Sequence, residues 1–179
     1  MALKLSQKEQ MLLQDQKSHE EICIKKYNTY ANQAQDPQLK QLFSSLAQQE
    51  QQHLNTINQI LAGKVPSTNQ QQGQQGQQSQ PGGQAQAMAA SGQGSGQQQG
   101  GSQTGGNAGQ NQNVSQADAN LCQDMLMTEK YVSGTYDTAI FEFTDSNVRQ
   151  VLNHIQKEEQ QHGEAIFKYM QSKGLYQVQ

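Results

Sequence analysis

The chain contains two copies of one sequence pattern. A shift of 109 residues aligns residues 12–57 with residues 121–166 without a gap. The identical pairs at this shift are Leu12/Leu121, Gln14/Gln123, Asp15/Asp124, Glu20/Glu129, Tyr27/Tyr136, Thr29/Thr138, Asp36/Asp145, Gln41/Gln150, Glu50/Glu159, Gln51/Gln160, Gln52/Gln161, His53/His162 and Ile57/Ile166. Apolar positions between them match in type, as in Leu42/Val151 and Leu46/Ile155. The repeat predicts two similar substructures that pack with pseudo-twofold symmetry.

Each copy has the pattern of two α-helices. Its apolar residues recur with the helical period, and a short turn at residues 35–36 or 144–145 separates two such stretches. Asp36 before Pro37, and Asp145 in the other copy, are typical helix N-caps, while Gly63 and Gly174 are typical residues after a helix end. We therefore predict an all-α, antiparallel four-helix bundle made of two repeated hairpins.

A segment rich in glutamine and glycine separates the two copies. Residues 67–113 contain no charged residue and few apolar ones, so they have little to offset the entropy lost on ordering. The predicted organisation is a first hairpin at residues 1–63, a flexible linker at residues 64–114 and a second hairpin of the same bundle at residues 115–179. The linker serves either assembly or passive tethering.

Composition and motifs exclude several classes of protein. The formal net charge of −3 provides no basic surface for nucleic acid. The first residues lack the apolar region of a secretion signal, and no apolar run is long enough to span a membrane. Cys23 and Cys122 form neither a CxxC pair nor a disulfide framework, and phosphate-binding glycine motifs are missing. We expect a protein made in a reducing cytoplasm that binds neither nucleic acid nor membrane.

The matched pairs include six residues that commonly bind metals. Glu50 to His53 and Glu159 to His162 are both ExxH motifs, which place Glu and His on one helix face. That face is the apolar one, and Glu20 and Glu129 lie on the inner stripes of the first and third helices. Four bare carboxylates in a core would be costly, and two divalent cations would neutralise them. We predict a dinuclear site with the ligands Glu20, Glu50, His53, Glu129, Glu159 and His162.

The donor set indicates the class of metal and leaves one alternative. Mixed carboxylate and imidazole ligands favour iron or manganese, and zinc would also bind. A single ExxH motif is weak evidence, but two of them after matched glutamates are much stronger. The alternative is a bundle that keeps these residues without metal, and in which protonated Glu, water and Gln satisfy the hydrogen bonds of the buried polar groups.

A few other residues have secondary interpretations. Tyr27 and Tyr136 lie two turns after Glu20 and Glu129, and core packing is favoured over a role in supporting the ligands or as redox-active phenols. Cys23 and Cys122 are expected to be small buried apolar residues. Glu158 is expected to be solvated, although it stands near the predicted site.

Three stretches of the first copy carry a family resemblance. They are residues 10–15 (QMLLQD), 30–40 (YANQAQDPQLK) and 46–53 (LAQQEQQH). These stretches resemble the spore coat protein F (Coat F) family of endospore-forming Firmicutes, and the six-residue pattern resembles the ferritin-like superfamily, which includes rubrerythrin, bacterioferritin and manganese catalase. The rubredoxin part of rubrerythrin, with its two CxxC pairs, has no counterpart here. The ferritin-like resemblance implies that the second and third helices run parallel.

The resemblance gives the expected function. It implies a spore coat component, made in the mother-cell cytoplasm, that binds other coat proteins and holds a di-metal centre in a structural or protective role. The alternative is a di-iron or di-manganese oxidase or peroxide-removing enzyme of the rubrerythrin or manganese-catalase type. Iron storage is a weaker option. Homodimers and higher homo-oligomers are both compatible with the sequence.

Overall fold

Four α-helices make up most of the described chain. The computed structural model describes residues 3–67 and 115–176, and the linker predicted at residues 64–114 lies outside the described residues from residue 68 onward. The helices are α1 (Gln7–Gln33), α2 (Pro37–Leu61), α3 (Gln116–Glu142) and α4 (Ser146–Ser172). The described residues contain no strand. The predicted all-α fold of two hairpins is confirmed.

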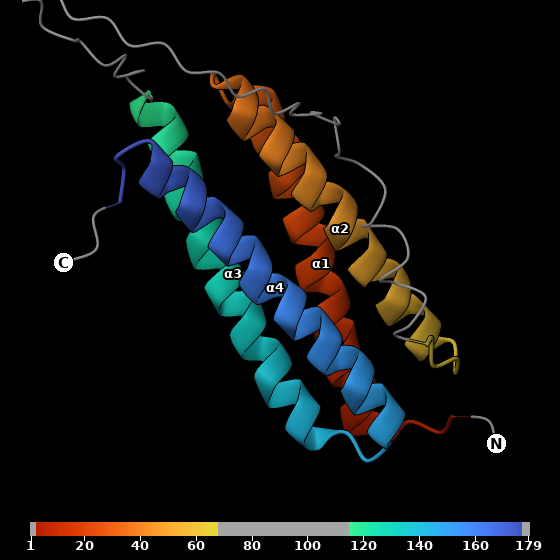
Figure 1. Cartoon of the computed structure of the whole chain (residues 1–179). Helices are drawn as coiled ribbons and strands as arrows, with labels where there is room; N and C mark the ends of the chain where they lie inside the picture. The colour runs from red at the N-terminus through yellow and green to blue at the C-terminus, as the bar shows by residue number, and fades with distance from the viewer. Residues whose placement is uncertain (1–2, 68–114, 177–179) are drawn as a thin grey trace, which may run out of the picture.

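The helices form a bundle in which closely packed neighbours are antiparallel. Figure 1 shows α1 and α4 running in one direction and α2 and α3 in the other. α1 packs against α2 and α3, and α4 packs against α3 and α2. The parallel helices α2 and α3 are therefore diagonal to each other in the bundle. The end of α2 is at the opposite end of the bundle from the start of α3 (Figure 1). The parallel course expected from the ferritin-like resemblance is confirmed.

The ends of α2 and α4 follow the predicted caps. Asp36 accepts a hydrogen bond from the backbone N–H of residue 38 at 2.7 Å, and Asp145 accepts one from residue 147 at 2.8 Å. These bonds satisfy N–H groups that have no partner within the helix. Gly63 and Gly174 follow the two helices with φ of 79° and 71°, a left-handed conformation that suits glycine.

The starts of α1 and α3 are also matched by the repeat. Ser6 accepts a hydrogen bond from the Glu9 N–H at 3.2 Å, and Glu9 returns one by accepting from the Ser6 N–H at 2.7 Å. At the corresponding place Ser115 accepts from the Asp118 N–H at 3.1 Å. Each helix thus begins with a serine cap and an acidic residue three positions later.

The two acidic residues also brace the turn of the opposite hairpin. Glu9 accepts hydrogen bonds from the N–H and the hydroxyl of Thr144, at 2.8 and 3.0 Å, in the turn between α3 and α4. Asp118 accepts from the N–H groups of Gln35 and Asp36, at 2.8 and 2.9 Å, in the turn between α1 and α2. Each hairpin therefore holds the turn of the other hairpin in place.

The core is apolar at both ends and polar in the middle. One cluster of buried apolar residues contains Ile57, Val132 and Ile155, and the other contains Phe43, Met125 and Ile166. On α2, α3 and α4 the predicted metal ligands fall between these two clusters. Cys23 and Cys122 are buried among the apolar residues as expected. None of the described helices has an apolar stretch that could cross a membrane.

Candidate metal centre

The structure brings all six predicted ligands together in the middle of the bundle. Glu20 comes from α1, Glu129 from α3, and the two ExxH motifs from α2 and α4. The side chains point inward because each lies on the same stripe as the apolar core residues of its helix. All six residues are only 0–1% exposed.

The six residues form two overlapping groups of four. The first group, which we call the His53 position, consists of Glu20, Glu50, His53 and Glu159. The second group, the His162 position, consists of Glu50, Glu129, Glu159 and His162. Within each group one ligand atom from every residue lies within 4.8 Å of the others. Glu50 and Glu159 belong to both groups, as carboxylates that bridge two ions would.

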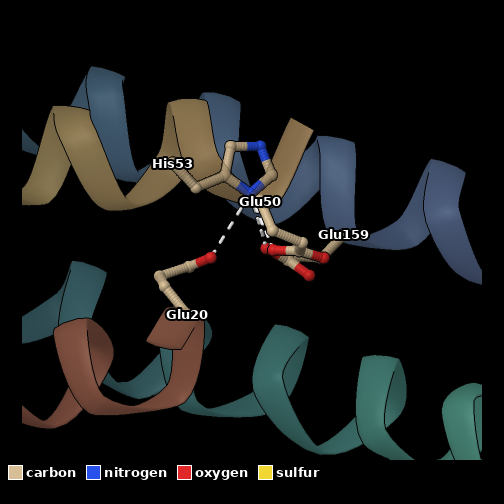
Figure 2. Close-up of side chains that lie close together, drawn as sticks. All are labelled: Glu20, Glu50, His53 and Glu159. Atoms are coloured by element: carbon tan, nitrogen blue, oxygen red, sulfur yellow. Dashed lines mark ion pairs between the residues drawn. The ribbon is translucent and has the colours of Figure 1, made fainter. Parts of the chain in front are cut away.

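Both histidines direct Nδ1 toward the carboxylates. His53 Nδ1 lies 2.9 Å from Glu159 Oε1 and 3.3 Å from Glu50 Oε2. Figure 2 shows the His53 position, with its imidazole nitrogen facing the carboxylates of the other three residues. His162 Nδ1 lies 3.0 Å from Glu50 Oε1, and the two imidazole rings stack with their centroids 5.4 Å apart. The arrangement of one histidine thus repeats that of the other.

The outer nitrogens of the histidines also have matched partners. His53 Nε2 lies 3.1 Å from Glu158 Oε2, and His162 Nε2 lies 3.0 Å from Gln49 Oε1. An acceptor at Nε2 fixes the proton there and leaves Nδ1 available to a metal ion. Gln49 was not among the residues predicted from the sequence. Glu158 does lie near the site, but it is half-buried and not solvated as expected. The signal was available, because these residues match at the repeat shift and each directly precedes the Glu of an ExxH motif.

The two repeated tyrosines contact the carboxylates of α1 and α3. The Tyr27 hydroxyl donates a hydrogen bond to Glu129 Oε1, and the Tyr136 hydroxyl donates one to Glu20 Oε1. Both phenols are fully buried, and burial raises the pKa of each well above its usual value. The favoured interpretation, core packing, therefore describes only part of their role, since each also orients a predicted ligand.

The metal-free cluster retains protons near neutral pH. Burial raises the pKa of Glu20 to about 8 and that of Glu159 to about 7. Burial and the nearby Glu159 and Glu50 carboxylates raise the pKa of Glu129 well above its usual value. Burial opposes ionisation of Glu50 as well, but a hydrogen bond from His162 and the nearby His53 imidazole lower its pKa. Burial would lower the pKa of His53, yet its carboxylate partners raise it.

The hydrogen bonding of the cluster is incomplete in a way that suits cations. The oxygens Glu20 Oε2, Glu50 Oε2, Glu129 Oε2 and both oxygens of Glu159 are buried and have no hydrogen-bond donor among the described residues. His53 Nδ1 is close to Glu159 and Glu50 in distance but is not in hydrogen-bond geometry. Leaving buried polar atoms without partners is costly, and divalent cations would use these oxygens as ligands. The residues therefore fit a metal site.

A surface pocket lies beside the cluster. It has a volume of about 460 Å³ and lies between α3 and α4. Glu129 and Glu159 form part of its wall, together with apolar residues that include Leu126, Phe167 and Tyr176.

Each half of the chain matches a known protein family. Residues 117–179 match the Coat F domain family, and residues 12–86 match the rubrerythrin family. Neither the curated proteins nor the solved structures contain a significant match to the chain. The resemblance to Coat F and to the ferritin-like superfamily is confirmed.

The two matches divide the candidate ligands evenly. The Coat F match contains Glu129, Glu159 and His162, and the rubrerythrin match contains the other three ligands. The stretches that carried the expected Coat F resemblance lie in the first hairpin, whereas the Coat F match falls on the second.

Proposed function

Since its two halves match the Coat F and rubrerythrin families, we propose that the chain is a spore coat component whose bundle holds two divalent metal ions. Iron and manganese suit the mixed carboxylate and imidazole donors best. The observation that carries the proposal is the buried, twofold-repeated cluster of four glutamates and two histidines, whose carboxylate oxygens lack donors.

The chain's own residues would each have a distinct role at this centre. Glu50 and Glu159 would bridge the ions, while Glu20 with His53 and Glu129 with His162 would complete the two positions. The metal ions would supply positive charge that replaces protons on the carboxylates. Since the ligands come from all four helices, metal binding would tie the helices together and stabilise the fold.

The proposed role in the coat is structural or protective. The Coat F match supports assembly with other coat proteins, in a coat built from the mother-cell cytoplasm. The linker would then connect two hairpins that together form one metal centre.

A second function has its own supporting observation. The pocket beside Glu129 and Glu159 is a route by which a small molecule can approach the centre, and the first hairpin matches rubrerythrin. The alternative is therefore a di-iron or di-manganese oxidase or peroxide-removing enzyme. Bound metal would supply the redox chemistry at this centre.

Metal analysis tests both functions. The chain is purified from cells supplemented with iron or manganese, its metal content is measured, and it is then exposed to peroxide and to oxygen. About two equivalents without turnover would support the structural role, and two equivalents with rapid turnover would support the enzyme. A purified chain that contains no metal, and takes none up after dialysis against either ion, would contradict both.

A further inference from the structure

The two halves of the centre differ in two respects, and both differences distinguish the His53 position from the His162 position. We propose that the His53 position holds its ion more tightly, and that the His162 position is the exchangeable one, at which a small anion or a peroxide-sized molecule binds through the pocket. This inference rests on the proposed function, because it requires that the cluster holds two ions.

The first difference is the charge of the group behind each histidine. Glu158 accepts from His53 Nε2 at 3.1 Å, while the matched residue Gln49 accepts from His162 Nε2 at 3.0 Å. A carboxylate makes the imidazole a stronger ligand and adds negative charge near the ion, whereas an amide is neutral. His154 Nε2 also lies 3.5 Å from Glu158 Oε2, without a hydrogen bond between them.

The second difference is access from the surface. The pocket between α3 and α4 touches Glu129, which is a ligand of the His162 position only, and the bridging Glu159. Glu20 and the two histidines are not among its lining residues, so Glu129 is the lining residue that distinguishes the two positions. A molecule in this pocket would therefore reach the ion at the His162 position first.

The sequence explains why the second hairpin has this pocket. Gly163 directly follows His162 and lines the pocket, and the matched residue of the first hairpin is Leu54, which is half-buried. Ser133 lines the same pocket, and its counterpart is the half-buried Ile24. At both places the first hairpin thus has a large apolar side chain where the second has a small residue.

The available space determines the class of ligand. A Cβ atom at Gly163 would lie 3.7 Å from Leu126 Cδ1 and 3.8 Å from Glu129 Cβ, in ordinary van der Waals contact. The glycine therefore leaves room for a methyl group between these two side chains. The carboxylates behind it are buried, so only a compact donor such as azide or peroxide can approach the ion.

Cobalt titration tests the inequality of the two positions. Co²⁺ binding to the full chain is followed by calorimetry and by visible absorption, and we expect two separate steps. Glu20→Ala should remove the tight step, and Glu129→Ala should remove the weak one. Glu158→Gln should weaken the tight step by about 10- to 100-fold, and Gln49→Glu should strengthen the weak step.

Three results of the titration would overturn the inference. Loss of the tight step in Glu129→Ala, with retention in Glu20→Ala, would reverse the assignment. The wild type could instead bind cobalt in two equal steps that neither Glu158→Gln nor Gln49→Glu changes. That result would contradict the difference in affinity between the two positions, but it would still support the metal centre. A wild type that takes up no cobalt would contradict the metal centre itself, and this inference with it.

Azide binding to the cobalt-loaded chain tests the access route. Gly163→Leu copies the residue of the first hairpin and should weaken or slow azide binding at least tenfold, with two equivalents of metal retained. Leu54→Ala is the matched control on the first hairpin and should leave azide binding unchanged. Ser133→Ile and Gly163→Ala fill the pocket by other means and should weaken azide binding if Gly163→Leu fails to fold. Unchanged azide binding in the folded pocket-filling variants, or its loss in Leu54→Ala alone, would overturn the proposed route.

Discussion

The hydroxyl of Tyr27 on α1 donates a hydrogen bond to Glu129 on α3, so the first hairpin orients a candidate ligand of the second. In the same way, the hydroxyl of Tyr136 on α3 donates a hydrogen bond to Glu20 on α1. The centre is therefore built across the interface between the two copies. Neither copy contains a complete set of ligands with their hydrogen-bond partners.

Removing either hydroxyl should weaken metal binding at one position. Tyr27→Phe removes the donor to Glu129 and should lower the affinity of the His162 position, while Tyr136→Phe should lower that of the His53 position. We expect decreases of about 10- to 100-fold, the range observed when an outer hydrogen bond to a metal ligand is lost. Stepwise metal titration measures both. Equal effects of the two variants on both steps would contradict the assignment.

Replacing single ligands should reduce metal content. Glu50→Ala, His53→Ala, Glu159→Ala and His162→Ala should each lower the content to one equivalent or less, because every position depends on four ligands. Elemental analysis of the purified variants provides the measurement. Glu21→Ala is a suitable control, since Glu21 is an exposed carboxylate next to Glu20. Full metal loading in all four variants would contradict the dinuclear site.

The metal-free chain should lose stability as the pH rises from about 5 to 9. Glu20 and Glu159 have pKa values near 8 and 7, raised by burial from an unfolded value of 4.5. A raised carboxyl pKa means that the folded state holds the proton more tightly, so its stabilising effect is complete below the unfolded pKa and disappears as pH passes the folded one. The raised pKa of His53 acts in the same direction.

Thermal unfolding with a chelator measures this pH dependence. We expect the melting temperature to fall by at least ~5 °C, since ~1 kcal/mol corresponds to a few degrees for a domain of this size. With saturating metal the fall should be absent, because the cations replace the protons. A variant with all six ligands changed to Leu or Met should be insensitive to chelator and nearly flat in this range. A wild type that melts identically with and without chelator would argue against bound metal.

Weakening a turn brace should affect stability and leave the metal centre intact. Asp118→Asn removes the charge that accepts hydrogen bonds from the N–H groups of Gln35 and Asp36. We expect a loss of about 1.5–3 kcal/mol, typical of hydrogen bonds to a charged group. Urea unfolding gives the loss, and metal analysis should still find two equivalents. A drop in metal content at full stability would show that the brace also positions the ligands.

Shortening the linker should not change the metal stoichiometry. The predicted ligands and their hydrogen-bond partners all lie within residues 3–67 and 115–176. Because α2 ends at the opposite end of the bundle from the start of α3, the linker must still span ~40 Å, the length of a helix of this size. We therefore expect two equivalents of metal in a chain whose linker is reduced to about 20 residues, which can reach that far when extended. Loss of metal with the helices still formed, as judged by circular dichroism, would show that the linker is part of the site.

The helices, the caps of α2 and α4 and the inward face of the six ligands followed from the sequence alone. These features depend on local rules, namely the 3.6-residue period, side-chain caps such as Asp36 and Asp145, and the i, i+3 spacing of the ExxH motifs. The repeat added the symmetry, because matched residues occupy equivalent places in the two hairpins.

Only the tertiary structure decided which side chains meet across the helices. The contacts of Tyr27 with Glu129, of Glu158 with His53 and of Asp118 with the first turn all join residues more than 80 positions apart. The rotation and offset of each helix set these contacts, and they depend on how all the core side chains pack together. The same packing opens the pocket beside Gly163 and gives His53 and His162 different surroundings. Helical periodicity places a residue on a face of its own helix, but it contains no information about which neighbour that face meets.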